Sequence, residues 1–205
     1  MVPFRYCSVV LLAAVTSLIP VQNTGKQNEK AGAAPERSAS LITIHVHKTG
    51  FLSGLGHNHT VTAPITRGRV DSKGMAAEIV VVTQTMKVVD PDVSDKDRAE
   101  IQSTMLGPKV LDAAKFPEIR FASSRIEPAG QGHYRVTGKL DLHGTSRDLT
   151  FEVTGGPEHY HGQTKLKQTD FGIQPVTVAG GTIKVKDEIE LEFDVNSADL
   201  TGGAK

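Results

Sequence analysis

The sequence contains no tryptophan, a single cysteine and no excess of charge of either sign. Among its 205 residues, 23 lysines and arginines balance 23 aspartates and glutamates, so electrostatics give no argument for a nucleic-acid partner or an anionic surface. One cysteine excludes an intramolecular disulfide framework, a multi-cysteine zinc site and an iron–sulfur cluster. With 38% hydrophobic and 22% charged residues, the composition is that of a globular chain of one domain, with or without a tail.

The first 24 residues have the pattern of a secretory signal peptide. Arg5 precedes an apolar run from Val9 to Ile19, which Pro20 ends. This run is shorter than the roughly 20 apolar residues that span a bilayer. We therefore expect residues 1–24 to be removed, leaving a periplasmic or secreted protein without a membrane span. An uncleaved anchor is the alternative, because no clear cleavage site precedes Gly25.

Residues 25–40 contain no large apolar side chain. Such a segment has too little surface to bury, so it is predicted to be a disordered linker. The folded domain is expected over residues 41–197.

From residue 41 onward, apolar and polar residues alternate with a period of two. The alternation is clear over residues 41–47, 134–143, 148–153 and 188–195. Because successive side chains on a strand point to opposite faces, each segment has one dry and one wet face, as is typical of antiparallel sheets. Turn residues separate about eight such strands. Closure into an all-β barrel or sandwich is expected because it removes exposed edges.

One segment departs from the alternation and predicts a helical excursion near residues 94–114. Ser94 is a good N-cap, Ile101 and Met105 fall on one side of a helix, and Gly107-Pro108 ends it. A helix at this point is expected to cover one end of a barrel.

Four segments in a fixed order resemble the YceI-like family. They are HKTGFLSGLGH (47–57), LDAAKFPEIRFASSRIE (111–127), YRVTGKLDLHGTSRDLTFEV (134–153) and LKQTDFGI (166–173). Each motif alone is weak, and their collinear order carries the resemblance. The resemblance implies a lipocalin-like antiparallel barrel with an extended apolar pocket, in an exported protein that binds a polyisoprenoid lipid such as a quinone.

The predicted function is therefore that of an exported carrier. We expect an isoprenoid-type lipid, either a quinone or a polyprenyl chain, to be held without covalent attachment in the barrel interior. Small inward residues such as Gly138 and Gly162 are expected to leave volume there. The residues predicted to line the pocket are Phe51, Leu55, Val61, Ile79, Val81, Met105, Leu111, Phe116, Phe121, Val136, Leu140, Phe151, Phe171, Leu191 and Phe193. The alternative is that these side chains only fill a core, as in a structural or stress protein without a ligand.

Six of the eight histidines fall in three H-x-H pairs, which give a second candidate site. The pairs are His45/His47, His57/His59 and His159/His161. Along their strands, the histidines of the first and third pairs alternate with apolar residues, so we expect these histidines to face water. His57 and His59 share the parity of Val61, so we interpret them as candidates to hydrogen-bond a lipid headgroup at the pocket mouth. The competing function is a histidine-based, transition-metal-binding periplasmic protein with these two residues as ligands, although one pair is short of a full ligand set.

No motif of a serine hydrolase, zinc protease, P-loop or dinucleotide-binding enzyme is present. We therefore expect no enzymatic activity, no cofactor other than the lipid, and no nucleic-acid partner. The sequence does not determine the oligomeric state, and it is compatible with a homodimer.

Overall fold

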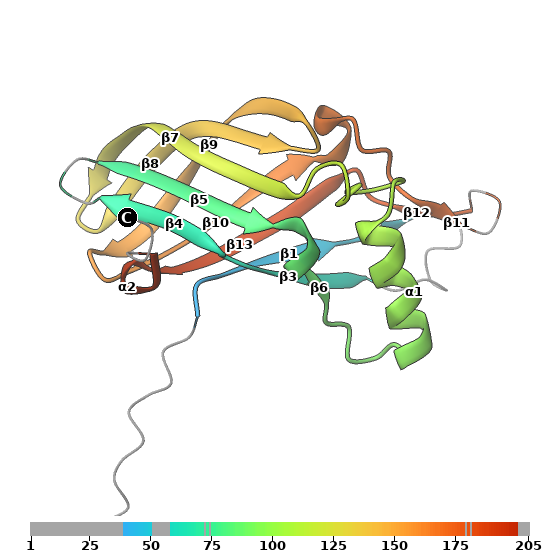
Figure 1. Cartoon of the computed structure of the whole chain (residues 1–205). Helices are drawn as coiled ribbons and strands as arrows, with labels where there is room; N and C mark the ends of the chain where they lie inside the picture. The colour runs from blue at the N-terminus through green and yellow to red at the C-terminus, as the bar shows by residue number, and fades with distance from the viewer. Residues whose placement is uncertain are drawn as a thin grey trace, which may run out of the picture. The chain divides into compact units, whose positions relative to one another are not determined.

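The structure, a computed structural model, describes the folded part of the chain (Figure 1). The described residues are 39–50, 58–71, 73, 75–178, 180 and 182–200. All of them belong to the second of two units into which the chain divides, Arg37–Lys205. The signal peptide expected at 1–24, nearly all of the linker expected at 25–40, and Phe51, Leu55 and His57 lie outside the described residues.

One curled antiparallel sheet of ten strands forms most of this unit. Across the sheet its order is β4 (Arg67–Asp71), β5 (Ala76–Val82), β7 (Glu118–Gly130), β8 (His133–Leu142), β9 (Thr145–Gly156), β10 (His159–Lys167), β13 (Glu188–Asn196), β1 (Leu41–Val46), β3 (His59–Pro64) and β6 (Lys87–Val88). The strands wrap around a common interior (Figure 1). The all-β, antiparallel, barrel-type fold predicted from the alternation is confirmed.

The chain itself joins the edge strand β4 to β3, which lies next to β6 at the other edge of this sheet. β3 pairs with β1, and it continues through Ile65 and Thr66 into β4, which pairs with β5 at the other edge. The Ile65 N–H donates to the Ser40 carbonyl at 3.1 Å, and the Thr66 N–H donates to the Val80 carbonyl at 2.9 Å. If β3 and β4 are counted as one bent strand, eight strands surround the interior with the two-residue β6 beside them, as the sequence predicts.

The expectation that Gly138 and Gly162 leave empty volume is wrong, because phenylalanine rings already fill these positions. A Cβ built on Gly138 would lie 2.6 Å from Cζ of Phe121, and one on Gly162 would lie 2.4 Å from Cζ of Phe193. Each glycine lets a ring lie directly against the backbone of the neighbouring strand. The glycines therefore position two aromatic rings inside the sheet.

The predicted helical excursion is confirmed as α1 (Asp95–Leu106). The Ser94 hydroxyl accepts the Asp97 N–H at 3.2 Å, which caps the helix. In the middle of α1, the Gln102 side-chain amide accepts the Val88 N–H and donates to the Met86 carbonyl, both at 2.8 Å. The helix thus pairs backbone groups at the edge strand β6, and Met105 packs against the core beside it.

The remaining elements are short. They are β2 (Lys48–Thr49), β12 (Ile183–Val185) and β11 (Thr177–Val178) in a three-stranded sheet, the 3-10 turns Thr83–Thr85 and Gln168–Phe171, and α2 (Ser197–Leu200). Leu200 of α2 is 3% exposed and packs over Gly68 on the edge strand β4. Within the described ranges, the helices lack the length and apolarity needed to cross a bilayer.

Removing the buried hydroxyl of Thr83 is expected to destabilise the fold. Thr83 is 1% exposed, and its hydroxyl donates to the Phe116 carbonyl at 2.8 Å. Thr83→Val keeps the shape but leaves this carbonyl without its donor, so the free energy of unfolding should fall by about 1–3 kcal/mol. Urea denaturation measures the loss. The same substitution at exposed Thr154 should change stability by less than about 0.5 kcal/mol, and an equal loss at both sites would refute this explanation.

Candidate functional site: an apolar cavity inside the barrel

The interior of the sheet contains a cavity of about 440 Å³. This volume lies within the roughly 300–1,000 Å³ range of small-molecule pockets. Its wall is formed by Ile42, Ile65, Val70, Asp71, Met75, Ala77, Ile79, Phe121, Ile126, Pro128, Gly130, Tyr134, Val136, Leu140, Leu149, Phe151, Val153, Tyr160, Thr164, Leu191, Phe193 and Val195. Nearly every strand of the sheet contributes to it, so the cavity depends on the whole barrel.

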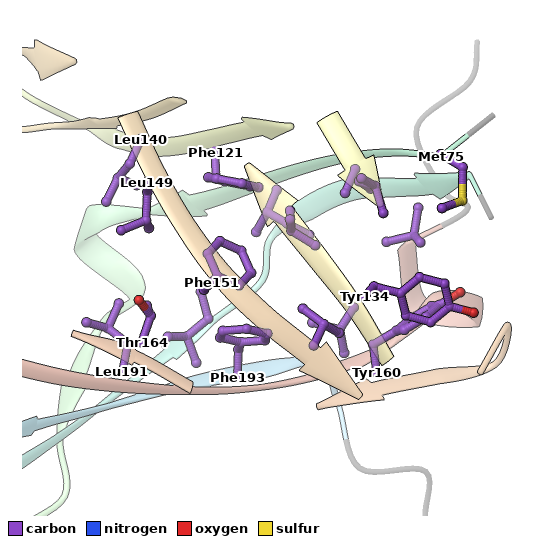
Figure 2. Close-up of a pocket in the computed structure, with 18 of the residues that line it drawn as sticks. Met75, Phe121, Tyr134, Leu140, Leu149, Phe151, Tyr160, Thr164, Leu191 and Phe193 are labelled. Atoms are coloured by element: carbon purple, nitrogen blue, oxygen red, sulfur yellow. The ribbon is translucent and has the colours of Figure 1, made fainter. Parts of the chain in front are cut away.

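The wall is almost entirely apolar. Among the described residues that line it, Asp71 has the only charged side chain, and Tyr134, Tyr160 and Thr164 have the only hydroxyl groups. Figure 2 shows Thr164 at one end, near Leu191, and the two tyrosines at the other end. Such a wall offers a long apolar contact surface with polar atoms confined to its ends.

Three phenylalanine rings form the middle of one wall (Figure 2). The centroids of the Phe121 and Phe151 rings are 5.3 Å apart, and those of Phe151 and Phe193 are 5.0 Å apart, in tilted and edge-on geometry. These separations are favourable for aromatic pairs. Gly138 and Gly162 hold the outer two rings close to the sheet, so the aromatic wall follows directly from those glycines.

Tyr134 and Tyr160 form an edge-on pair at the other end of the cavity. Their ring centroids are 6.0 Å apart, with an interplanar angle of 73°. Burial, assisted by the nearby Tyr134, raises the pKa of the Tyr160 hydroxyl. The group therefore stays protonated, and able to donate a hydrogen bond, well above neutral pH.

The interior is solid at the α1 end and hollow beyond it. Leu140, Leu149 and Leu191 belong both to the packed core and to the cavity wall, and Figure 2 shows them at one end of the pocket, so they form its floor. Behind them, the core is closed by side chains from the region around α1, among them Met105 and Leu111. The cavity extends from this floor to the hairpin end, where Asp71 and Met75 flank the β4–β5 turn.

The structure divides the predicted pocket residues into two described groups. Those that line the cavity are Ile79, Phe121, Val136, Leu140, Phe151, Leu191 and Phe193. Those that lie elsewhere are Val61, Val81, Met105, Leu111, Phe116 and Phe171. Most of the second group pack in the solid core; Phe116 instead packs against the His143 ring at 4.6 Å and over Gly144.

His59 does not line the cavity, and it is paired with a buried carboxylate. Its Nδ1 lies 2.7 Å from Oδ2 of Asp90, whose side chain is 5% exposed. The other oxygen of Asp90 accepts the Thr60 N–H at 2.7 Å. This geometry ties the start of β3 to the segment after β6, which gives His59 a structural role.

The other two H-x-H pairs face water, as their parity predicts. His45 and His159 have side chains 33% and 56% exposed, and each lies beside a carboxylate of β13. The closest contact joins Nε2 of His159 to Oδ1 of Asp194 at 2.6 Å. Within the described residues, no three histidine, cysteine, aspartate or glutamate side chains gather to hold a metal ion.

Several residues of the cavity wall are not among the predicted lining residues, although the alternation of apolar and polar residues places them on the inner face. Tyr134 has the parity of Val136, and Tyr160 has the parity of Thr164, so both belong on the inner face. Leu149, Val153 and Val195 follow the same rule on β9 and β13. The period-two signal identifies these inner positions, but the choice among them needs the three-dimensional position of the cavity.

A comparison with known families now identifies the chain. The model of the YceI-like domain matches residues 35–197, which cover the whole described barrel. The chain belongs to the YceI-like family. The resemblance inferred from the four collinear motifs is confirmed.

Two curated relatives of this YceI-like protein are UPF0312 proteins. The one from Vibrio campbellii is 31% identical over 115 residues, or 51% of this chain and 59% of the relative. One from Vibrio cholerae is 30% identical over 132 residues, or 60% of this chain and 66% of the relative. The matched regions thus span about half to two thirds of the curated relatives.

Among solved structures, the YceI-like barrel is similar to the crystal structure of BcnA from Burkholderia cenocepacia. The TM-score is 0.52 at 21% identity, and the match covers 76% of this chain and 94% of BcnA. At this identity the similarity supports the fold alone. The lipocalin-like architecture is therefore shared with an experimentally determined structure.

Proposed function

We propose that this YceI-like protein is an exported carrier that holds an isoprenoid-type lipid, a quinone or a polyprenyl chain, inside its barrel. The observation that carries the proposal is the apolar cavity of about 440 Å³ between the floor at Leu140 and the tyrosine pair. Family membership supports the isoprenoid class, because that class is what the resemblance implies. The signal-like pattern of residues 1–24 supports a location outside the cytoplasm.

Burial of an apolar chain is sufficient to drive this binding. Each buried CH₂ contributes about 0.8 kcal/mol, so ten such groups contribute about 8 kcal/mol before the cost of ordering the ligand. A free energy of this size corresponds to a dissociation constant near 1 μM, and the cost of immobilisation weakens it. No charged or covalent anchor is required.

The wall chemistry favours binding over catalysis. General acid–base or nucleophilic catalysis needs a nucleophile next to a base, or two titratable groups whose pKa values are shifted in opposite directions. The cavity wall has a single carboxylate, Asp71, and no histidine, cysteine or lysine among the residues the structure places there. We therefore assign the cavity a carrying or sequestering role.

Native mass spectrometry of freshly purified protein, followed by mass spectrometry of a solvent extract, tests this function. We expect an adduct of several hundred daltons that the solvent removes and that has the mass of an isoprenoid lipid. A metal-sized adduct would instead support the histidine-based alternative. The absence of any adduct, together with no uptake of an added isoprenoid, would contradict the proposal.

The length of the tail provides a graded prediction. At about 30 Å³ for each water-sized group, a cavity of 440 Å³ holds about fifteen such groups. Affinity should therefore rise steeply from a C5 to a C15 isoprenoid alcohol and change little beyond that length. Competition against a neutral fluorescent probe, N-phenyl-1-naphthylamine, measures the series. A constant affinity from C5 to C15 would argue against binding in this cavity.

A further inference from the structure

The floor of the cavity is a boundary between two successive layers of inner side chains. Residues two apart on a strand point to the same face of the sheet. On β8, β10 and β13, the last inner residues that line the cavity are Leu140, Thr164 and Leu191. The next inner residues towards the α1 end, which belong to the packed core and not to the cavity wall, are Leu142, Leu166 and Ile189. The interior therefore changes from hollow to solid within one two-residue step on three strands.

The same boundary crosses strands on the other side of the interior. On β5, Ile79 lines the cavity, whereas Val81 is 3% exposed and lies in the core. On β1, Ile42 lines the cavity and Ile44 lies in the core. The floor thus extends across the barrel, so the end of a ligand tail would meet it whichever wall the tail follows.

Two of the floor leucines are only partly committed to the core. Leu140 is a buried member of the core cluster, whereas Leu149 and Leu191 are partly buried and pack against that cluster. On β8, the residue directly opposite Leu149 is Gly138, which has no side chain of its own to fill the space. Figure 2 shows both leucines at the end of the pocket. Shortening either side chain to alanine removes three carbon atoms where the cavity stops.

We propose that Leu140, Leu149 and Leu191 form a length gauge that limits the enclosed part of an isoprenoid tail to about three isoprene units. This limit follows from a cavity of 440 Å³, which holds about fifteen groups of water size. A longer tail leaves its additional units outside the cavity and gains no affinity from them. The inference rests on the proposed carrier function, and it narrows the ligand class to isoprenoids with a tail of about fifteen carbon atoms.

The experiment compares geraniol (C10), farnesol (C15) and geranylgeraniol (C20), which share a headgroup and differ by one isoprene unit. Displacement of N-phenyl-1-naphthylamine from the full chain gives the three affinities. In the unaltered protein, farnesol and geranylgeraniol should bind within about twofold of each other, and geraniol at least tenfold more weakly. Leu149→Ala and Leu191→Ala should each bind geranylgeraniol about tenfold more tightly than farnesol. Each further buried CH₂ raises affinity about fourfold, and the substitution makes room for up to three carbon atoms.

Matched variants separate the length gauge from general effects on the barrel. Leu142→Ala removes the same three carbon atoms one layer behind the floor, so it should destabilise the fold and leave the ratio of C20 to C15 affinity within about twofold. Val195→Ala changes the cavity wall beside Tyr160, away from the floor, and should also leave this ratio unchanged. Leu149→Phe extends the floor into the cavity and should weaken farnesol at least tenfold relative to geraniol. Urea denaturation verifies that each variant is folded.

The contrary outcomes are distinguishable. An unchanged length preference in folded Leu149→Ala and Leu191→Ala variants would overturn the length gauge, and Leu149→Phe decides the question if the alanine variants do not fold. An equal shift in Leu142→Ala would show that loosening of the barrel changes the preference, which also overturns it. If the unaltered protein already binds geranylgeraniol tenfold more tightly than farnesol, the gauge fails and the carrier function stands. If it binds none of the three alcohols, both fail.

Discussion

Replacing Ala77 with phenylalanine should abolish lipid binding while leaving the barrel folded. Ala77 lies on β5, its side chain contributes to the cavity wall, and its N–H donates to the Ser123 hydroxyl at 2.8 Å, a contact that the substitution leaves in place. A phenyl ring at this position occupies space that the ligand tail needs. Displacing four CH₂ groups removes about 3 kcal/mol, so the dissociation constant should rise more than about a hundredfold.

The matched control places the same ring outside the barrel. Ala122 lies on the neighbouring strand, opposite Glu78, and is exposed. Ala122→Phe should leave binding within about twofold of the unaltered protein. Probe displacement measures binding, and urea denaturation verifies that both variants fold. Full binding by a folded Ala77→Phe variant would show that the ligand does not use this cavity.

Replacing Gly162 with alanine should lower the free energy of unfolding more than any other substitution on β10 that adds or removes one carbon atom. The new Cβ would lie 2.4 Å from Cζ of Phe193 and 2.7 Å from the Glu152 carbonyl oxygen. Neither the ring nor the backbone of β9 can move without disturbing the sheet, and overpacking of this kind typically costs 1–3 kcal/mol. We therefore expect Gly162→Ala to lower the free energy of unfolding by about 3 kcal/mol in urea.

Gly156→Ala provides the comparison at a position with no such neighbour. No atom lies within 4 Å of a Cβ built at Gly156, so its effect should stay below about 0.5 kcal/mol. In a double variant, Phe193→Leu should recover part of the loss caused by Gly162→Ala, because the shorter side chain gives the methyl group room. A Gly162→Ala variant as stable as Gly156→Ala would contradict the tight contact between Gly162 and Phe193.

The sequence predicts which side chains face the interior but not where the interior is empty. Val81 and Val136 are both apolar strand residues on the inner face, yet Val81 packs in the solid core and Val136 lines the cavity. The boundary between them depends on how α1 and Leu111 close one end of the barrel. That closure results from contacts between segments distant in sequence, which a period-two pattern does not contain.

The role of a single residue can be predicted where the strand alternation determines which face its side chain occupies. It cannot be predicted where a partner distant in sequence determines the position of the side chain. His45 and His159 face water because their strand neighbours face inward, and the alternation shows this directly. His59 also has inward parity, but its position is set by Asp90, which lies 31 residues later and beyond a turn. The glycines at 138 and 162 were identified as inner positions, while the rings that cover them belong to neighbouring strands.

The position of β1 between β13 and β3 determines when the barrel is completed. Leu41 pairs with Asp194, so the first and last long strands meet only after nearly the whole domain has been synthesised. Such distant pairings slow folding, since the entropy of closing a long loop must be lost before the contact forms. A nascent chain that lacks residues 188–196 has no β13 to cover β1. Under the proposed carrier function, a lipid would therefore enter the interior in the last stage of folding or after it.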